Sequence, residues 1–431
     1  MADPRLPAGP AAGPAGPVPV GAQLELTIGA PAHGGSCIAR HEGRVVFVRH
    51  ALPGERVRAR VTRDRGAYLF ADAVEVLDAS PDRVEPPCPY ARPGRCGGCD
   101  WQHASGPAQR ALKAEVIRDQ FRRIARLDVA DLLDEVRELP GGLLGWRTRN
   151  VYAVDADGRP GLHRHASHEI EHVDRCLLGA PGVGDSPVLA QTWRGYTGVE
   201  AVVGDDGVTT ILGHRPGPGR QARGRRPPDR VDVLDGPDPV HRHLHGRDFP
   251  VAAAGFWQVH PAAAPAFADA VRAGLAPRPG ERVLDLFAGA GALTGALAEA
   301  VGADGWVCGA EADRRAVADA AAALVDLPQA EVVRSRVTPE TVAALAARAP
   351  GGTVDLVVLD PPRAGAGRAV LVAVLALRPR AVGYVACDPA ALARDVATAR
   401  EAGWTLTSLA AFDAFPMTHH VECVAALAPP R

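Results

Sequence analysis

Lysine is almost absent from this chain of 431 residues, and Lys113 is its only example. Arginine supplies every other basic side chain, and Ala, Gly and Pro abound, as is typical of a GC-rich genome. Arginine counts alone are therefore weak evidence for an anion-binding surface. The formal net charge of −2 excludes a polycation that binds nucleic acid along its whole length. Any contact with nucleic acid must come from local patches.

Long apolar segments are also lacking. The uncharged stretch 6–24 is interrupted by five prolines and four glycines, which excludes a membrane helix and predicts a disordered tail over residues 1–19. No compact apolar segment typical of a signal peptide follows the start, and we expect a cytoplasmic protein with no membrane partner. In the cytoplasm, eight cysteines favour metal binding or catalysis over disulfides.

The first structured region, 20–80, alternates apolar and polar residues. Strands are predicted at 44–48 and 56–61, with a turn at 52–55, which indicates a small β-barrel. Residues 40–65 hold eight arginines against three acidic side chains. On a small barrel this excess favours a surface that follows a nucleic-acid backbone, although a solvated face in an arginine-rich protein is the alternative.

The second region, 81–248, holds a group of cysteines, a predicted helix at 107–127 that could pack on the last region, and several short strands. Its segment 215–230 carries six arginines among Gly and Pro, which predicts a mobile loop. That loop could contact RNA phosphates, and a plain solvated insertion is the alternative.

The last region, 249–431, alternates strand and helix patterns. Apolar runs predict strands at 283–287, 306–310, 331–334, 354–359, 381–386, 406–411 and 421–427. Helical runs lie between the first five, and another at 389–402 follows the fifth. This alternation predicts an α/β domain with a doubly wound parallel sheet.

The strand at 283–287 runs into a glycine turn. Gly289 and Gly291 let the backbone bend sharply and leave room for a ligand. Glu311, 22 residues after Gly289, ends the next strand, where an acid can accept hydrogen bonds from both hydroxyls of a ribose. The next glycine is Gly295, so the spacing differs from that of dinucleotide folds and is more typical of S-adenosylmethionine (SAM) sites. A turn that merely ends a strand is the alternative.

A lone thiol ends the strand at 381–386. Cys387 stands where open α/β sheets bind their ligands, and Glu422 lies on another predicted strand. A thiolate and a carboxylate base would suit chemistry in which sulfur adds and a proton then leaves. A helix starting near Pro389 would favour the thiolate. The alternative is a core thiol, because free cysteines are among the most buried residues.

Cys88, Cys96 and Cys99 lie in a segment rich in proline and glycine, and Cys176 follows much later. Four thiolates can hold an iron–sulfur cluster or a structural zinc ion. The paired Cys-x-x-Cys spacing of common zinc ribbons is missing, which favours the cluster. Buried cysteines without a ligand are a poor alternative, since this loop has no apolar periodicity.

Together these residues resemble the TRAM-containing RNA uracil-5-methyltransferases, over nearly the whole chain past the tail. The resemblance implies an oligonucleotide-binding (OB)-like TRAM barrel at 20–80, a small α+β iron–sulfur domain at 81–248 and a Rossmann-like class I SAM-dependent methyltransferase domain at 249–431. It implies that a [4Fe–4S] cluster is held by Cys88, Cys96, Cys99 and Cys176. It also implies that SAM is bound by Gln258, Phe287, Glu311 and Asp360, in addition to the glycine turn.

In the reaction that the resemblance implies, the Cys387 thiolate adds to carbon 6 of uracil. Carbon 5 then takes the methyl group, and Glu422 removes the proton. The target base must leave its stack, and the barrel would grip the flanking RNA.

Four features depart from the family pattern. Seven residues rather than five separate Cys88 from Cys96, and Ala292 stands where many members have asparagine. Ser335 and Arg336 replace an expected Asn/Asp contact to adenine. The motif at 386–389 is Ala-Cys-Asp-Pro, where Ser-Cys-Asn-Pro is commoner.

We expect a monomer that acts on 23S ribosomal RNA. The first alternative is a transfer-RNA uracil-5-methyltransferase, although those enzymes generally lack the barrel and the cysteine group. A second is a non-catalytic iron–sulfur protein that binds RNA, which the pairing of Cys387 with Glu422 argues against. A third is a NAD oxidoreductase, which the glycine spacing disfavours.

Overall fold

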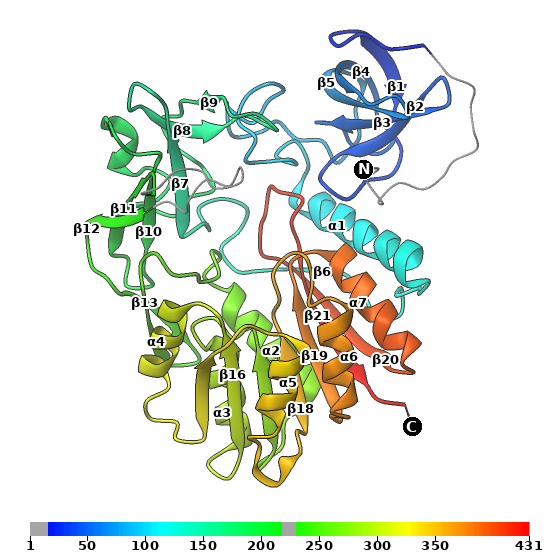
Figure 1. Cartoon of the computed structure of the whole chain (residues 1–431). Helices are drawn as coiled ribbons and strands as arrows, with labels where there is room; N and C mark the ends of the chain where they lie inside the picture. The colour runs from blue at the N-terminus through cyan, green and yellow to red at the C-terminus, as the bar shows by residue number, and fades with distance from the viewer. Residues whose placement is uncertain (1–15, 218–229, 431) are drawn as a thin grey trace.

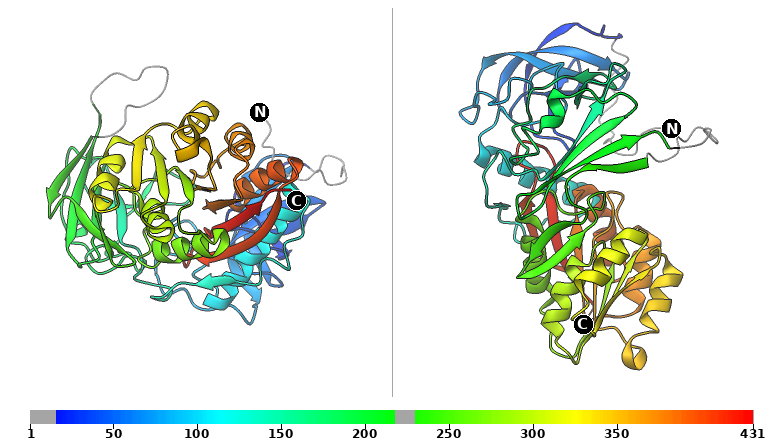
Figure 2. Two further views of the ribbon diagram at one scale, coloured as in Figure 1. Left: turned by 90° about the horizontal axis from the view of Figure 1, so that it is seen from below. Right: turned by 90° about the vertical axis from the view of Figure 1, so that its left-hand side faces the viewer.

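The computed structural model describes residues 16–217 and 230–430, and its three regions pack against one another. The barrel and the central region lie on one side of the α/β domain (Figures 1 and 2). The expected tail lies outside the described residues except for 16–19, where the Val18 amide donates to Asp64 Oδ2 at 2.9 Å. Most of the arginine-rich loop lies outside them as well. No helix among the described residues is long and apolar enough to cross a membrane.

The first region is a five-stranded sheet, in the order β1-β4-β5-β3-β2, that curls into a small barrel (Figure 1). Its strands are β1 (Gln23–Thr27), β2 (Cys37–His41), β3 (Arg44–Arg49), β4 (Arg56–Asp64) and β5 (Tyr68–Asp78). Alternation places one set of side chains inside, among them Val46, Val57 and Leu69, which are fully buried. The predicted strands at 44–48 and 56–61 are confirmed.

The central region contains a six-stranded sheet in the order β12-β11-β10-β7-β8-β9. Its strands are β7 (Arg149–Val154), β8 (Pro160–His163), β9 (Ile170–Glu171), β10 (Gly198–Val203), β11 (Thr209–Arg215) and β12 (Arg230–Asp235). A 3-10 turn (Pro187–Ala190) lies beside it, and the hairpin of β13 (Val240–Leu244) and β14 (Arg247–Val251) leads into the last region.

Helix α1 (Gly106–Gln120) leaves the central region and packs along the α/β domain (Figure 1). It continues as a π-helical turn (Phe121–Ala125) that contacts α7. Ile117 and Phe121 are fully buried in the core of that domain. The helical segment 106–125 therefore covers most of the range predicted at 107–127, and it packs against α7 and β6 of the α/β sheet domain.

The α/β domain is built on an eight-stranded sheet in the order β17-β16-β15-β18-β19-β21-β20-β6. Its strands are β15 (Arg282–Leu286), β16 (Trp306–Glu311), β17 (Ala330–Arg334), β18 (Leu356–Leu359), β19 (Ala381–Ala386), β20 (Thr405–Asp413), β21 (Glu422–Ala428) and β6 (Val136–Glu138). Its helices are α2 (Ala263–Leu275), α3 (Ala292–Val301), α4 (Arg314–Ala323), α5 (Pro339–Ala346), α6 (Arg368–Ala376) and α7 (Pro389–Glu401), with a short 3-10 turn (Pro350–Gly352).

Two features of this sheet differ from the predicted parallel sheet. Strand β21 runs antiparallel to both β19 and β20, because the short segment after β20 returns the chain beside it as a hairpin-like pair. The edge strand β6 comes from the central region and pairs in parallel with β20. The α/β domain therefore includes a strand that lies more than a hundred residues before its predicted start.

Candidate active site and cysteine pocket

The glycine turn after β15 is tied to the end of β16. Phe287, Gly289 and Gly291 all have positive φ, at 69°, 56° and 84°. Glu311 Oε2 accepts from the Gly289 amide at 3.0 Å, and Oε1 accepts from the Asp313 amide at 2.7 Å. A left-handed phenylalanine is strained, and such strain collects at ligand sites. The turn and Glu311 thus form one preorganised edge.

Two carboxyl groups lie beneath this edge. Asp285 is fully buried, accepts from Thr294 Oγ1 at 2.6 Å and has its other oxygen unpartnered. Burial raises the pKa of Asp285 to about 6, and burial together with Asp285 raises that of Asp360 to about 7. Gln258 is half-buried just before α2. Acids whose ionisation is opposed in this way would be stabilised in their charged form by a cationic ligand.

Cys387 and Glu422 meet at the ends of adjacent strands. Ala386 of β19 pairs with Cys423 of β21, so the next residue of β19 and the preceding residue of β21 lie across from each other. Glu422 is buried, and Cys387 is half-buried. The structure therefore brings together the two residues that the sequence places 35 positions apart.

The electrostatics of this pair favour the protonated thiol. Burial and the Glu422 carboxylate raise the pKa of Cys387 to about 12, against a lowering by Arg363. Burial, and then Asp360, raise the pKa of Glu422 well above its ordinary value. Helix α7 does start at Pro389 as expected, and desolvation by burial is the largest influence on the pKa of the thiol.

A pocket of ≈ 410 Å³ opens in front of the thiol. Cys387 lines it together with Arg363, His419 and His420, and with His33 from the barrel. The Arg363 guanidinium lies 3.3 Å from His420 Nε2, and the two histidine rings are 4.0 Å apart. The cationic and aromatic lining suits a nucleotide with its phosphate.

The loop between β20 and β21 forms one wall of this pocket and is held from outside its own domain. The amides of Asp100 and Trp101 both donate to the Met417 carbonyl, at 3.0 and 3.1 Å. Gln109 Oε1 accepts from the Met417 amide at 2.7 Å, and Met417 has a left-handed φ of 68°. Asp100 Oδ2 also accepts from His419 Nδ1 at 2.6 Å.

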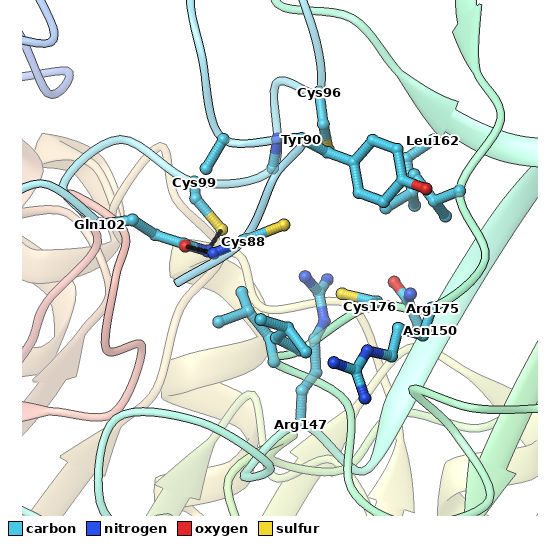
Figure 3. A pocket seen from close by; sticks show the side chains of 15 residues that line it. Cys88, Tyr90, Cys96, Cys99, Gln102, Arg147, Asn150, Leu162, Arg175 and Cys176 are labelled. Carbon is cyan, nitrogen blue, oxygen red and sulfur yellow. Dashed lines mark hydrogen bonds between the residues drawn. The ribbon is translucent and has the colours of Figure 1, made fainter. Parts of the chain in front are cut away.

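The four predicted metal ligands line a second pocket, in which the sulfurs of Cys88, Cys99 and Cys176 point toward one space (Figure 3). Gln102 Nε2 donates to Cys99 Sγ at 3.1 Å. Burial, followed by the other thiols of the group, raises the pKa of Cys96 to about 11 and also that of Cys88. Among the described residues, however, no three His, Cys, Asp or Glu side chains converge closely enough to hold a single metal ion.

The fold and this site define a SAM-dependent methyltransferase domain joined to a small β-barrel. Residues 17–74 match the TRAM domain model, and residues 352–429 match the tRNA (uracil-5-)-methyltransferase model. The crystal structure of Pyrococcus abyssi tRNA (uracil-54, C5)-methyltransferase with S-adenosyl-L-homocysteine superposes with a TM-score of 0.67, at 19% identity, over 94% of this chain and 100% of that one.

An RNA methyltransferase of uncharacterised specificity from Streptomyces avermitilis is 48% identical, over 95% of this chain and 99% of its own length. The 23S rRNA (uracil(1939)-C(5))-methyltransferase of Chromohalobacter salexigens is 35% identical, over 92% of this chain and 87% of its own. The chain belongs to the RNA (uracil-C5)-methyltransferase family. It is therefore an enzyme, and the NAD oxidoreductase and the non-catalytic RNA-binding protein are set aside.

Several residues at the pocket were not singled out by the sequence. Arg363 follows the Asp-Pro-Pro segment, and His419 and His420 stand just before Glu422, so proximity to predicted site residues was the available signal. No such signal pointed to His33, because it lies in a barrel loop that is far from the methyltransferase domain along the chain.

Proposed function

We propose that this enzyme forms 5-methyluridine in 23S ribosomal RNA, with Cys387 as nucleophile and Glu422 as base. The observation that carries the proposal is the pairing of these two residues at the strand ends, with the thiol lining the ≈ 410 Å³ pocket. The ribosomal relatives at 33–35% identity favour the larger RNA. We expect the enzyme to act as a monomer in the cytoplasm.

Transfer RNA is the second candidate substrate. The archaeal transfer-RNA enzyme shares its fold with nearly the whole of this chain, so a TRAM-type architecture does not by itself select ribosomal RNA. The presence of the barrel therefore does not distinguish a ribosomal RNA substrate from a transfer RNA substrate. The choice rests on the relatives.

The residues present fit SAM, which when bound supplies an electrophilic methyl group. The turn at Phe287 and Gly289 would let the backbone approach the ligand, and the Glu311 carboxylate would accept hydrogen bonds from its ribose hydroxyls. Asp360 and its neighbour Asp285 offset the positive charge of a sulfonium ligand, and Gln258 lies near the start of α2. Ala292, at the first position of α3, has no polar group to replace the family's asparagine.

Cys387 provides the covalent step. Its sulfur bonds to carbon 6 of uracil, and the electron pair of the 5,6 double bond moves into an enolate that is nucleophilic at carbon 5. After carbon 5 has gained the methyl group, Glu422 takes the proton from that carbon. The carbon–sulfur bond then breaks, the double bond re-forms, and Cys387 is released as thiolate. A uracil can reach this half-buried sulfur only when it has left its stack.

Two variants test these roles. Cys387→Ala is expected to abolish 5-methyluridine formation, because no group replaces the sulfur, and undiminished product would contradict the assignment. Glu422→Gln is expected to trap a covalent RNA adduct, visible as a gel-shifted band that resists denaturation. Normal turnover without adduct would remove Glu422 as the base. Mass spectrometry of purified ribosomal and transfer RNA from a deletion strain decides between the two substrates.

We further propose that the four-cysteine pocket holds a [4Fe–4S] cluster. The thiols surround a cavity and do not meet at a point, which suits a polynuclear group better than one zinc ion. The Gln102 amide would orient and stabilise the Cys99 thiolate. Iron and acid-labile sulfide should be found in anaerobically purified protein and be lost from Cys99→Ser, whereas one zinc ion per chain would contradict the cluster.

A further inference from the structure

A barrel residue, His33, lines the ≈ 410 Å³ pocket that contains Cys387, which we call the base pocket. His33 lies between β1 and β2, and its Nε2 is 3.0 Å from Asp388 Oδ2. Asp388 directly follows Cys387 in the sequence. The two side chains are 29% and 22% exposed. His33 therefore lines the pocket at the point where the barrel and the methyltransferase domain meet.

The loop that carries His33 is held in place and is not a free surface segment. The carbonyl of Gly35 accepts from Trp101 Nε1 at 3.1 Å. Gly35 has a φ of 87°, and a Cβ there would come within 2.9 Å of Asp100 Cγ, so the loop packs closely on that side chain. Asp100 in turn binds His419 of the pocket wall.

Asp388 has two tasks at this position. It caps α7, since its Oδ1 accepts from the Ala391 amide at 2.7 Å. Burial opposes its ionisation, but hydrogen bonds from His33 and Ala391 lower its pKa below the ordinary value. Asp388 is therefore an anion beside Cys387, and its charge works against the thiolate and against RNA phosphate. The neighbouring histidine places its Nε2 within hydrogen-bond distance of that carboxylate, at 3.0 Å.

We propose that His33 is a positioning residue for methyl transfer, which closes the base pocket from the barrel by partnering the Asp388 carboxylate. The inference rests on the proposed function, because it concerns the nucleotide that faces Cys387. The carboxylate directly after the thiol thus has its nearest histidine partner on the barrel and not on its own domain. His33 and Asp388 form a matched pair across two domains.

A double-variant cycle tests the pair with wild-type RNA substrate and full-length protein. His33→Ala should lower kcat/KM for RNA about tenfold by leaving a partly buried carboxylate unpartnered, with SAM affinity unchanged. Asp388→Asn supplies the second background of the cycle, because asparagine caps a helix equally well without charge. In the Asp388→Asn background, His33→Ala should have little further effect, within about twofold.

The cycle separates the pairing from simple docking. A tenfold loss on His33→Ala in both backgrounds would overturn the proposal, since the histidine would then act on RNA or as a structural contact. No loss in either background would overturn it as well. If Asp388→Asn fails to fold, as judged by thermal unfolding, Asp388→Ser replaces it with another good capping residue.

Two controls complete the experiment. His241→Ala removes a histidine–aspartate pair of similar length, 2.9 Å to Asp248, on the distant β13–β14 hairpin and should leave activity unchanged. Wild-type turnover and loss of product in Cys387→Ala test the proposed function separately. A failure of the His33 prediction with both of those intact would therefore refute the pairing alone.

Discussion

Cys387 lies between opposing influences at its strand end. Glu422 on β21, Asp360 after β18 and Asp388 each hold its pKa up, in addition to burial, whereas Arg363 lowers it. In the free enzyme these influences together favour the thiol of Cys387 over its thiolate. A protected resting thiol also resists oxidation, which requires thiolate character.

Alkylation of the free enzyme measures this directly. Below the raised pKa of about 12, the thiolate fraction of Cys387 rises about tenfold per pH unit, so the rate of its reaction with iodoacetamide should rise through pH 9 without a plateau. Peptide-resolved mass spectrometry separates Cys387 from the other cysteines. A plateau near pH 7 would mean that the thiol is activated at rest.

The Glu422→Gln variant tests whether the Glu422 carboxylate raises the pKa of the Cys387 thiol. Removing a neighbouring negative charge lowers the pKa of the Cys387 thiol, so alkylation at pH 9 should become faster even though turnover is lost. Glu331→Gln is the matched control, because Glu331 is a surface residue paired with Arg348. Unchanged or slower alkylation in Glu422→Gln would show that the carboxylate does not act on the thiol.

At this scale the sequence predicted the residues that end strands. Cys387, Glu311 and Asp360 follow apolar runs, and carboxyl ends of parallel strands share one edge of a sheet. His33 could not be predicted, because its contact with Asp388 depends on how a barrel docks, and no local pattern encodes docking. The raised pKa of Cys387 could not be predicted either, because it comes mainly from burial in the folded protein. The expected effect of the helix that starts at Pro389 does not include that burial.

Among the elements, α1 joins the central region to the methyltransferase domain through the single lysine. Lys113 Nζ donates to Asp413 Oδ1 at 2.5 Å and to the Phe415 carbonyl at 3.1 Å, and the two charged side chains are 0% and 1% exposed. Asp413 ends β20 and begins the loop that walls the base pocket. The helix therefore fixes that loop as well as covering the sheet.

Removing one partner of this buried pair should be costly. Lys113→Met leaves the Asp413 carboxylate buried without a counter-charge, and we expect a loss of about 3 kcal/mol in unfolding free energy, measured by urea denaturation. The double change with Asp413→Leu should recover much of that loss. Arg110→Ala is the control on the same helix, because its partly exposed pair with Glu138 is worth under about 1 kcal/mol.

An equal loss in Lys113→Met and in the double variant would contradict this reasoning, because it would assign the cost to packing and not to charge.

The elements themselves were largely predictable. Strand β6, of three residues, was not, since it is too short to show a period and forms only because β20 offers it an edge.

Across the whole molecule, the barrel presents aromatic rings beside arginine. Phe47 stacks on Phe70 at 5.5 Å between centroids, Tyr68 meets both edge-on, and the Arg63 guanidinium lies 5.6 Å from the Phe70 ring. The rings are partly exposed on β3 and β5. Such a surface suits unpaired bases that flank the target uridine.

Truncating these rings should weaken RNA binding without affecting SAM. The double variant Phe47→Ala and Phe70→Ala should raise the Kd for RNA by at least about tenfold, given ~1–3 kcal/mol per stacked base. Arg63→Ala should reduce the salt dependence of binding by about one counterion. Val74→Ala, an exposed apolar change on the same barrel, is the control, and equal affinities for all variants would exclude this face.

The position of β21 has a consequence for synthesis of the chain. It is downstream of every other strand in the sheet, yet it lies between β19 and β20, and the edge strand β6 pairs only with β20. Until β21 leaves the ribosome, β20 and β6 have no hydrogen-bonded link to the rest of the sheet. The same strand begins with Glu422, so a nascent chain completes its sheet and acquires its proposed base in one event. A partly made chain that lacks β21 therefore lacks both the link between the two parts of the sheet and the proposed base.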